Sequence, residues 1–255
     1  MAAPALVALA HASRDSRSTK TITALVEEVK AQRPDLRVER AFLDTGAART
    51  RRVRPEFQAV IDRLVKAGHE EIVVVPLALS DGSGAEVPGV ADAVAEATAR
   101  HHGLQVRVSA DLGLETCYLE VLDERLREVL RASRVRELDA LVLAAAGSTD
   151  ALANQTVARL ARLWGTHHRL PVTAAYAASA PPATGEAVRA FRAEGRRHIA
   201  VASLFLTPGE LTDRAAELAL EAGAVAVSEP MGAHPEIARV VLARYAVGAV
   251  ELVPV

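Results

Sequence analysis

The sequence predicts an α/β protein made of two similar doubly wound lobes, each with a four-stranded parallel sheet flanked by helices. Three observations predict this class. Short apolar runs alternate with helix-period segments along the 255 residues, and the order of these segments recurs from residue 138 onward. Continuous apolar runs such as IVVVPLAL indicate strands buried on both faces, which is typical of parallel sheets.

The first half supplies four strand and helix pairs. In the first helix, apolar residues at i, i+3, i+4 and i+7 from Ile22 form one stripe that a sheet can bury. Gly68 ends the second helix, as a C-cap glycine does. The predicted elements, alternately strand and helix, are residues 5–10, 18–32, 36–43, 56–67, 71–79, 90–100, 105–112 and 116–131.

The second half repeats the first in its letters as well as in its pattern. Residues 6–15 (LVALAHASRD) align with residues 141–150 (LVLAAAGSTD), and two longer segments align in the same order. Each copy is long enough to bury a core of its own. We therefore expect an N-terminal lobe over 1–135, which carries the candidate active site, and a C-terminal repeat lobe over 136–255.

Composition excludes several classes of protein. The formal charge of −2 lacks the basic excess of a nucleic-acid binder, and no apolar run has the length of a membrane span. The single cysteine, Cys117, fits a reducing compartment, so we expect a cytoplasmic protein. Nucleotide-binding glycine motifs, HExxH and GxSxG are absent from the sequence, and we expect no organic cofactor.

The loop after the first strand holds a histidine that the repeat does not share. Ligands of open parallel sheets bind at the carboxyl ends of the strands, where His11 stands and where the second copy has Ala146. Ser13 and Asp15 persist in both copies, which favours a structural role as helix caps. A lone histidine is usually structural, but His11 is the best candidate for a ligand or proton acceptor. The other seven histidines are assigned no role, and His234 is expected to start a helix.

The loop after the second strand begins with Asp44, where the second copy has an alanine. This carboxylate can accept protons beside His11, or it can cap the turn that follows. The same loop continues with the densest cationic run of the chain, which includes Arg49, Arg51 and Arg52. Such a run is either a solvated face or a surface that attracts a polycarboxylate or phosphate ligand.

The loop after the third strand, SDGSGAEVP, combines glycines with carboxylates. Gly82 and Gly84 allow close backbone approach to a ligand, and Glu86 supplies a carboxylate. The segment that begins at Ser80 is therefore either a mobile lid or an irregular turn.

With these segments in order, the chain resembles the long, duplicated form of the CbiX/SirB family of sirohydrochlorin chelatases. The resemblance rests on LVALAHASRD, VERAFLD, VVVPLALSDG, LAAAGSTD, AVASLFLTPG and MGAHPEIARVVLARY, and it covers nearly the whole chain. It implies two Rossmann-like lobes of the class II chelatase fold and a cleft that holds a tetrapyrrole. It also implies insertion of Co²⁺ or Fe²⁺ into sirohydrochlorin, for cobalamin or sirohaem biosynthesis, without ATP.

By this resemblance, His11 binds the metal and accepts a proton, and Asp44 stands where the family usually has a glutamate. The residues expected to contact the substrate are Ser13, Arg14, Arg49, Arg51, Arg52, Ser80, Gly82 and Gly84.

Two departures from the family pattern stand out. Ala12 replaces a glycine after the histidine, and Gly84 occupies the place of a second metal-binding histidine. Glu86 is the candidate that replaces this histidine as a metal ligand. The alternative is a non-catalytic protein of the same fold that binds a tetrapyrrole, a metal or a protein partner. Either protein is expected to be a monomer or homodimer, with no nucleic-acid or membrane partner.

Overall fold

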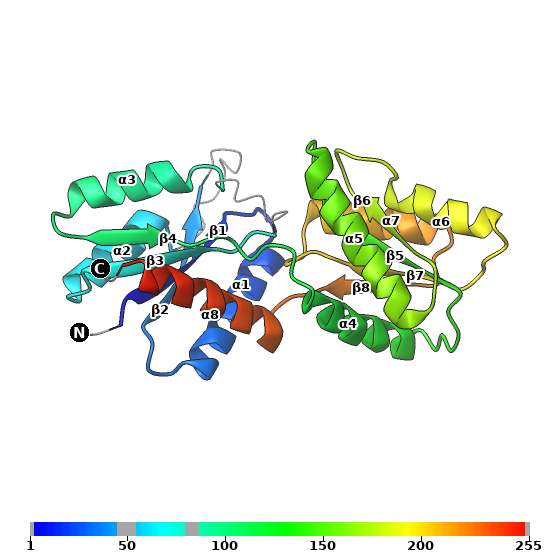
Figure 1. The fold of residues 1–255 in the computed structure, drawn as a ribbon, viewed down its shortest axis with the longest axis horizontal. Coiled ribbons are helices and arrows are strands. Elements are labelled where there is room, and N and C mark those ends of the chain that lie inside the picture. The colour runs from blue at the N-terminus through cyan, green and yellow to red at the C-terminus, as the bar shows by residue number, and fades with distance from the viewer. Residues whose placement is uncertain (1–2, 45–54, 80–86, 253–255) are drawn as a thin grey trace. The chain divides into compact units, whose positions relative to one another are not determined.

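The protein forms two compact α/β units, seen in a computed structural model that describes residues 3–44, 55–79 and 87–252. Unit 1 consists of Met1–Gly113 and Ala233–Val255, and unit 2 consists of Leu114–Gly232. Each unit holds one parallel sheet flanked by helices, which confirms the predicted fold class (Figure 1).

The sheet of unit 1 has the strand order β2-β1-β3-β4, and all of its pairings are parallel. The elements of unit 1 are β1 (Ala5–His11), α1 (Ser16–Gln32), β2 (Val38–Leu43), α2 (Phe57–Lys66), β3 (Glu71–Pro76), α3 (Val90–Arg100), β4 (Gln105–Val108) and α8 (Pro235–Val250).

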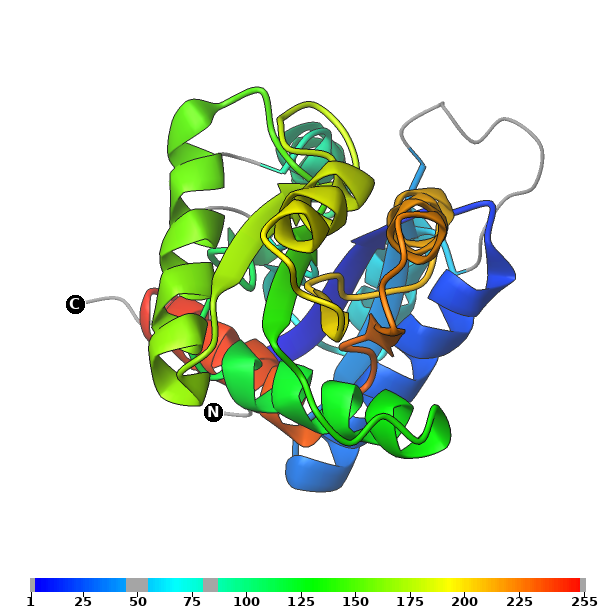
Figure 2. The ribbon, with the colours of Figure 1, turned by 90° about the vertical axis from the view of Figure 1, so that its right-hand side faces the viewer.

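The sheet of unit 2 has the equivalent order β6-β5-β7-β8. The elements of unit 2 are α4 (Tyr118–Ala132), β5 (Ala140–Ala145), α5 (Ala151–His168), β6 (Val172–Tyr176), α6 (Thr184–Ala193), β7 (Ile199–Ser203), α7 (Glu210–Glu221) and β8 (Ala226–Pro230). Helices α4 and α5 cover one face of this sheet, and α6 and α7 cover the other (Figure 2).

The strand register follows the sequence repeat, apart from a shift between Val201 and Ser203 where β7 pairs with β8. Ala5 pairs with Ile72 in the first sheet, and the aligned residues Ala140 and Ile199 pair in the second. The central strands are buried along almost their whole length, because helices cover both faces of each sheet. The two halves therefore share their order of apolar segments and form the same set of strand pairs.

The last helix of each half belongs to the unit built by the other half. Helix α4 packs against β7 and β8 of unit 2, and α8 packs against α1, β3 and β4 of unit 1. The two units therefore differ from the lobes expected over 1–135 and 136–255. In the described part of the chain, no helix combines the length and apolar character that crossing a membrane requires.

Candidate active site

The carboxyl ends of β1 and β2 bring His11 and Asp44 to one edge of the first sheet. His11 is the last residue of β1 and lies opposite Leu43, the last residue of β2. The backbone N–H of Ala12 continues this pairing by donating to the Leu43 carbonyl at 2.9 Å. Asp44 follows directly, and both His11 and Asp44 are exposed to solvent. The topology thus joins the two residues that the sequence predicts to act together.

The His11 ring is held by the segment that leads into α3. Its Nε2 lies 3.2 Å from the carbonyl oxygen of Pro88. Since a carbonyl only accepts hydrogen bonds, Nε2 is the donor, and a neutral ring then keeps its lone pair on Nδ1. A neutral imidazole with one tethered nitrogen can offer the other to a metal ion or a proton.

Gly89 brings this segment against the end of β2. Its φ of +79° is a conformation that side chains with a Cβ rarely adopt, and an added Cβ would lie 3.2 Å from Cδ2 of Leu43. The backbone at Pro88 and Gly89 therefore approaches the ends of β1 and β2 closely. Three chain segments meet at this edge.

Of the residues shared by both copies, Asp15 is the N-cap of α1, as predicted, whereas Ser13 is not a cap but binds the backbone of the cap residue. The hydroxyl of Ser13 accepts from the Asp15 N–H at 3.1 Å, and the Asp15 carboxylate accepts from the Arg17 N–H at 2.8 Å. The Arg17 side chain also donates to this carboxylate and lowers its pKa. The substrate contact expected of Ser13 stays a prediction, as does that of Arg14, which is exposed.

Unit 2 repeats this cap with the same chemistry. Ser148 accepts from the Asp150 N–H at 3.0 Å, and Asp150 accepts from the Leu152 N–H at 2.9 Å. His234 also confirms its expected role, because its Nδ1 accepts from the Glu236 N–H and caps α8.

Several predicted site residues lie outside the described part of the chain. They are Arg49, Arg51, Arg52, Ser80, Gly82, Gly84 and Glu86. The proposed second metal ligand, Glu86, is therefore a prediction that the structure does not test.

The profile of the CbiX family matches residues 5–129 and 140–247, which together span both copies of the repeat. The chain belongs to the CbiX family. No curated protein sequence matches it. The fold is similar to that of SirB from Bacillus subtilis with Fe³⁺, at a TM-score of 0.77, 19% identity and coverage of 97% of this chain and 96% of that one.

Two further solved structures share the fold of this CbiX-family chain. The sirohydrochlorin chelatase SirB from Bacillus subtilis subspecies spizizenii, in complex with cobalt, gives a TM-score of 0.75 at 19% identity and covers 98% and 97% of the two chains. A multi-domain protein from Deinococcus radiodurans with structural similarity to chelatases gives 0.64 at 20% identity and covers 97% and 56%. These likenesses establish the fold.

In this CbiX-family chain, the two copies of the strand-to-helix loop differ in backbone conformation. Gly147 has a φ of +86°, and an added Cβ would lie 2.0 Å from the carbonyl oxygen of Ala178. Ala12, at the aligned position in unit 1, is not among the described residues with positive φ. The loop after His11 therefore accommodates alanine by a different backbone path, without left-handed strain.

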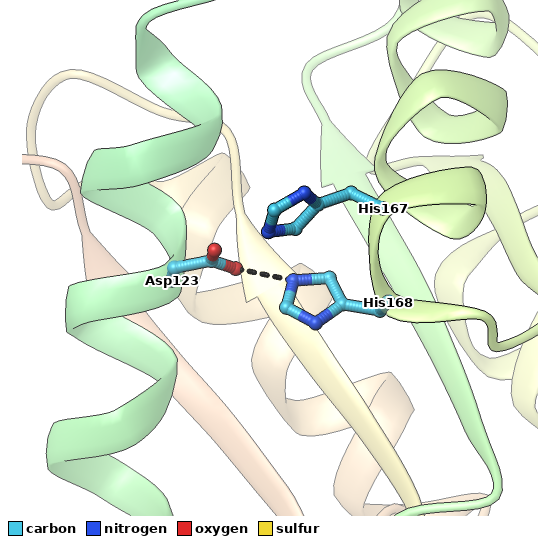
Figure 3. A group of neighbouring side chains, drawn as sticks. All are labelled: Asp123, His167 and His168. Carbon is cyan, nitrogen blue, oxygen red and sulfur yellow. Dashed lines mark hydrogen bonds and ion pairs between the residues drawn. The ribbon is translucent and has the colours of Figure 1, made fainter.

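Unit 2 also holds a polar cluster that sequence reasoning missed (Figure 3). Asp123 of α4 is buried, and its carboxylate accepts from Nε1 of Trp164 at 2.8 Å and lies 2.7 Å from Nε2 of His168. His167 lies beside His168, with 4.9 Å between the ring centroids. The signal in the sequence was an aspartate within the apolar stripe of a helix, but its partners come from a distant helix.

Proposed function

We propose that this protein is a sirohydrochlorin chelatase, which inserts Co²⁺ or Fe²⁺ into the tetrapyrrole ring for cobalamin or sirohaem biosynthesis. Its membership of the CbiX family supports this proposal. The observation that carries it is the exposed imidazole of His11 at the carboxyl edge of the first sheet, tethered through Nε2 by the Pro88 carbonyl.

The tether determines which His11 nitrogen takes part in the chemistry. Because Nε2 of His11 donates to the Pro88 carbonyl, Nδ1 is the nitrogen that presents the substrate metal to the tetrapyrrole. An imidazole nitrogen is a suitable ligand for cobalt and iron, and it binds them only when it is neutral.

Metal insertion also releases two protons from the pyrrole nitrogens of the tetrapyrrole, and each proton needs an acceptor. Once the metal has left Nδ1, the lone pair of His11 is available for one of them. Asp44, which follows the residue paired with His11, is our candidate for the other. The two protons then pass to solvent, since both side chains are exposed.

The proposed substrate carries carboxylates around its edge, and these need cationic and polar partners around His11 and Asp44. Arginine suits this task because its planar fork binds carboxylates with two hydrogen bonds. We assign the substrate carboxylates to Arg14, Arg49, Arg51 and Arg52, and closer contacts to Ser13, Ser80, Gly82 and Gly84. Glu86 is our candidate for the second, oxygen ligand of the metal.

The test is the initial rate of metal insertion into sirohydrochlorin by the full chain, with Co²⁺ and Fe²⁺ compared. We expect His11→Ala to lower kcat/KM by about 10²–10⁴-fold, the range of a lost acid–base group. The matched control is His101→Ala, because His101 also lies within hydrogen-bond distance of a partner but stands at the far end of α3.

A rate no higher than the uncatalysed one, together with measurable tetrapyrrole binding, would instead identify a non-catalytic binding protein. Retention of full activity by His11→Ala would contradict the assigned centre while leaving the function itself intact. The assay thus separates the reaction from the residue proposed to perform it.

A further inference from the structure

The Asp123 cluster lies wholly within unit 2 and takes no part in the proposed chelatase site. Asp123 is only 7% exposed, and both of its closest partners donate to the same oxygen, Oδ1. The second oxygen, Oδ2, lies 3.7 Å from Nη2 of Arg127. A buried carboxylate needs such compensation, because burial without it costs several kcal/mol.

The surroundings of this carboxylate match those of a metal ligand. Metal-binding carboxylates are themselves held by hydrogen bonds from outer residues, and the fully buried Trp164 supplies one here. The two imidazoles come from the last turn of α5, where the helix dipole favours positive charge. Figure 3 shows both rings on one side of the Asp123 carboxylate.

We propose that Asp123, His167 and His168 bind a divalent transition metal ion at a site separate from His11. One ligand atom from each side chain lies within 4.8 Å of the other two. Bonds of about 2.0–2.2 Å place the ligands of one ion up to roughly 4 Å apart, so a small side-chain movement closes the set. Two imidazoles and one carboxylate suit Zn²⁺, Co²⁺, Ni²⁺ and Fe²⁺.

The metal ion would replace the hydrogen that now lies between Nε2 of His168 and the carboxylate of Asp123. Nε2 of His168 carries the hydrogen that it donates to Asp123, since an ionised carboxylate only accepts. When the metal binds Nε2, the imidazole stays neutral with its one hydrogen on Nδ1. Water takes up the hydrogen from Nε2 and supplies the one on Nδ1. His167 is exposed, so water can fill the remaining coordination positions.

The repeat does not require this cluster. At the aligned positions of unit 1, Asp123 corresponds to Leu242, and the two histidines correspond to Gln32 and Arg33. The same pair of helix positions therefore packs without a carboxylate or an imidazole. The donor set is specific to unit 2, which argues against a role in the fold alone.

Trp164, the only tryptophan of the chain, makes the site directly measurable. Its indole touches Asp123, and its ring contacts that of His168 with 5.5 Å between centroids. Titration of the full-length His11→Ala protein with Co²⁺ at pH 7.5 should quench tryptophan emission saturably, with one ion per chain, and a chelator should reverse it. The His11→Ala background removes the other proposed metal site.

The decisive variant is His167→Gln, which leaves the Asp123–His168 hydrogen bond in place. We expect it to weaken Co²⁺ binding by at least about ten-fold, since even outer partners of metal ligands contribute 10–100-fold to affinity. His101→Gln is the matched control, because His101 lies at the same 2.7 Å from Asp62. Although His102 follows it, these side chains do not form a three-ligand group among the described residues, so the variant should leave binding unchanged.

Quenching that does not saturate below about 1 mM Co²⁺ would overturn the proposal, as would an unchanged midpoint in His167→Gln. Equal losses in His167→Gln and His101→Gln would also overturn it, because they would indicate non-specific binding. None of these results bears on metal insertion, so the test is independent of the proposed chelatase activity.

Discussion

The loops that follow β1 and β5 are the two copies of one duplicated segment, and only the first begins with a histidine. In both loops an aspartate caps the next helix and a serine accepts from the N–H of that aspartate, with hydrogen bonds that agree within 0.1 Å. The side chains around these caps differ, because His11 and Asp44 of unit 1 correspond to alanines in unit 2. Residues that persist in both copies thus build the loop, and residues that diverge mark the candidate site.

The largest expected effect comes from moving the histidine between the copies. In the double variant His11→Ala/Ala146→His, we expect insertion to stay about 10²–10⁴-fold below the wild-type level. The reason is that the edge of the second sheet has Ala178 where the first has Asp44. The measurement is kcat/KM for cobalt insertion. Recovery of wild-type activity would show that the carboxyl edges of the two sheets are equivalent and would contradict the proposed difference between them.

A second prediction compares Ala12 and Gly147, the residues that follow His11 and Ala146. Gly147→Ala should lower the free energy of unfolding by about 2–4 kcal/mol, because a Cβ meets the Ala178 carbonyl and the φ of +86° is unfavourable for alanine. Ala12→Gly, its counterpart, should cost less than about 1 kcal/mol, mainly through the entropy of the unfolded chain. Urea denaturation measures both, and equal effects would contradict the different backbone paths.

The smallest effect concerns the entry to the central strands. Asp139, just before β5, accepts from the N–H groups of Arg197 and His198, whereas unit 1 has Pro4 at the aligned position. Burial raises the pKa of Asp139, but these N–H groups outweigh burial and leave the pKa below its ordinary value. The carboxylate therefore stabilises the fold above its ordinary pKa of about 3.9, and this contribution is lost as the pH falls through the lower folded-state pKa.

Asp139→Asn should accordingly cost about 1 kcal/mol at pH 7, at the low end for a charged acceptor because the side chain is partly exposed. The difference from wild type should shrink between pH 4 and pH 2 as Asp139 itself becomes protonated. Urea denaturation at several pH values checks this trend, with the exposed Glu137→Gln as the control. A difference that stays constant with pH would contradict the assigned cause.

Periodicity predicts which segments form strands and helices better than it predicts where strands end. The apolar run expected to be a strand over 71–79 is a strand only to Pro76, and the run over 105–112 is a strand only to Val108. Leu77 and Leu112 beyond these ends are still buried. Their N–H groups still donate to the carbonyls of Leu9 and Ala78, but these bonds do not continue the ladder of paired residues that defines a strand, so the predicted strands run too long.

The exchange of α4 and α8 was beyond sequence reasoning for a related reason. Three of their buried residues align, Tyr118 with Ile237, Leu122 with Val241 and Leu126 with Tyr245, so the apolar pattern alone does not tell which sheet each helix covers. The repeat singles out His11 because the two copies differ there, and the role assigned to His11 stays a prediction. The contact between Asp123 and Trp164 was not predictable, because it joins helices that are remote in the sequence.

This exchange makes the two halves of the chain mutually dependent. A polypeptide cut between residues 135 and 136 would separate each sheet from a helix that shields one of its faces. The exposed strands would then present apolar side chains to water, which favours association. A single repeat could cover this face by exchanging the helix with a second copy, and the fusion of two repeats joins the partners of such an exchange in one chain.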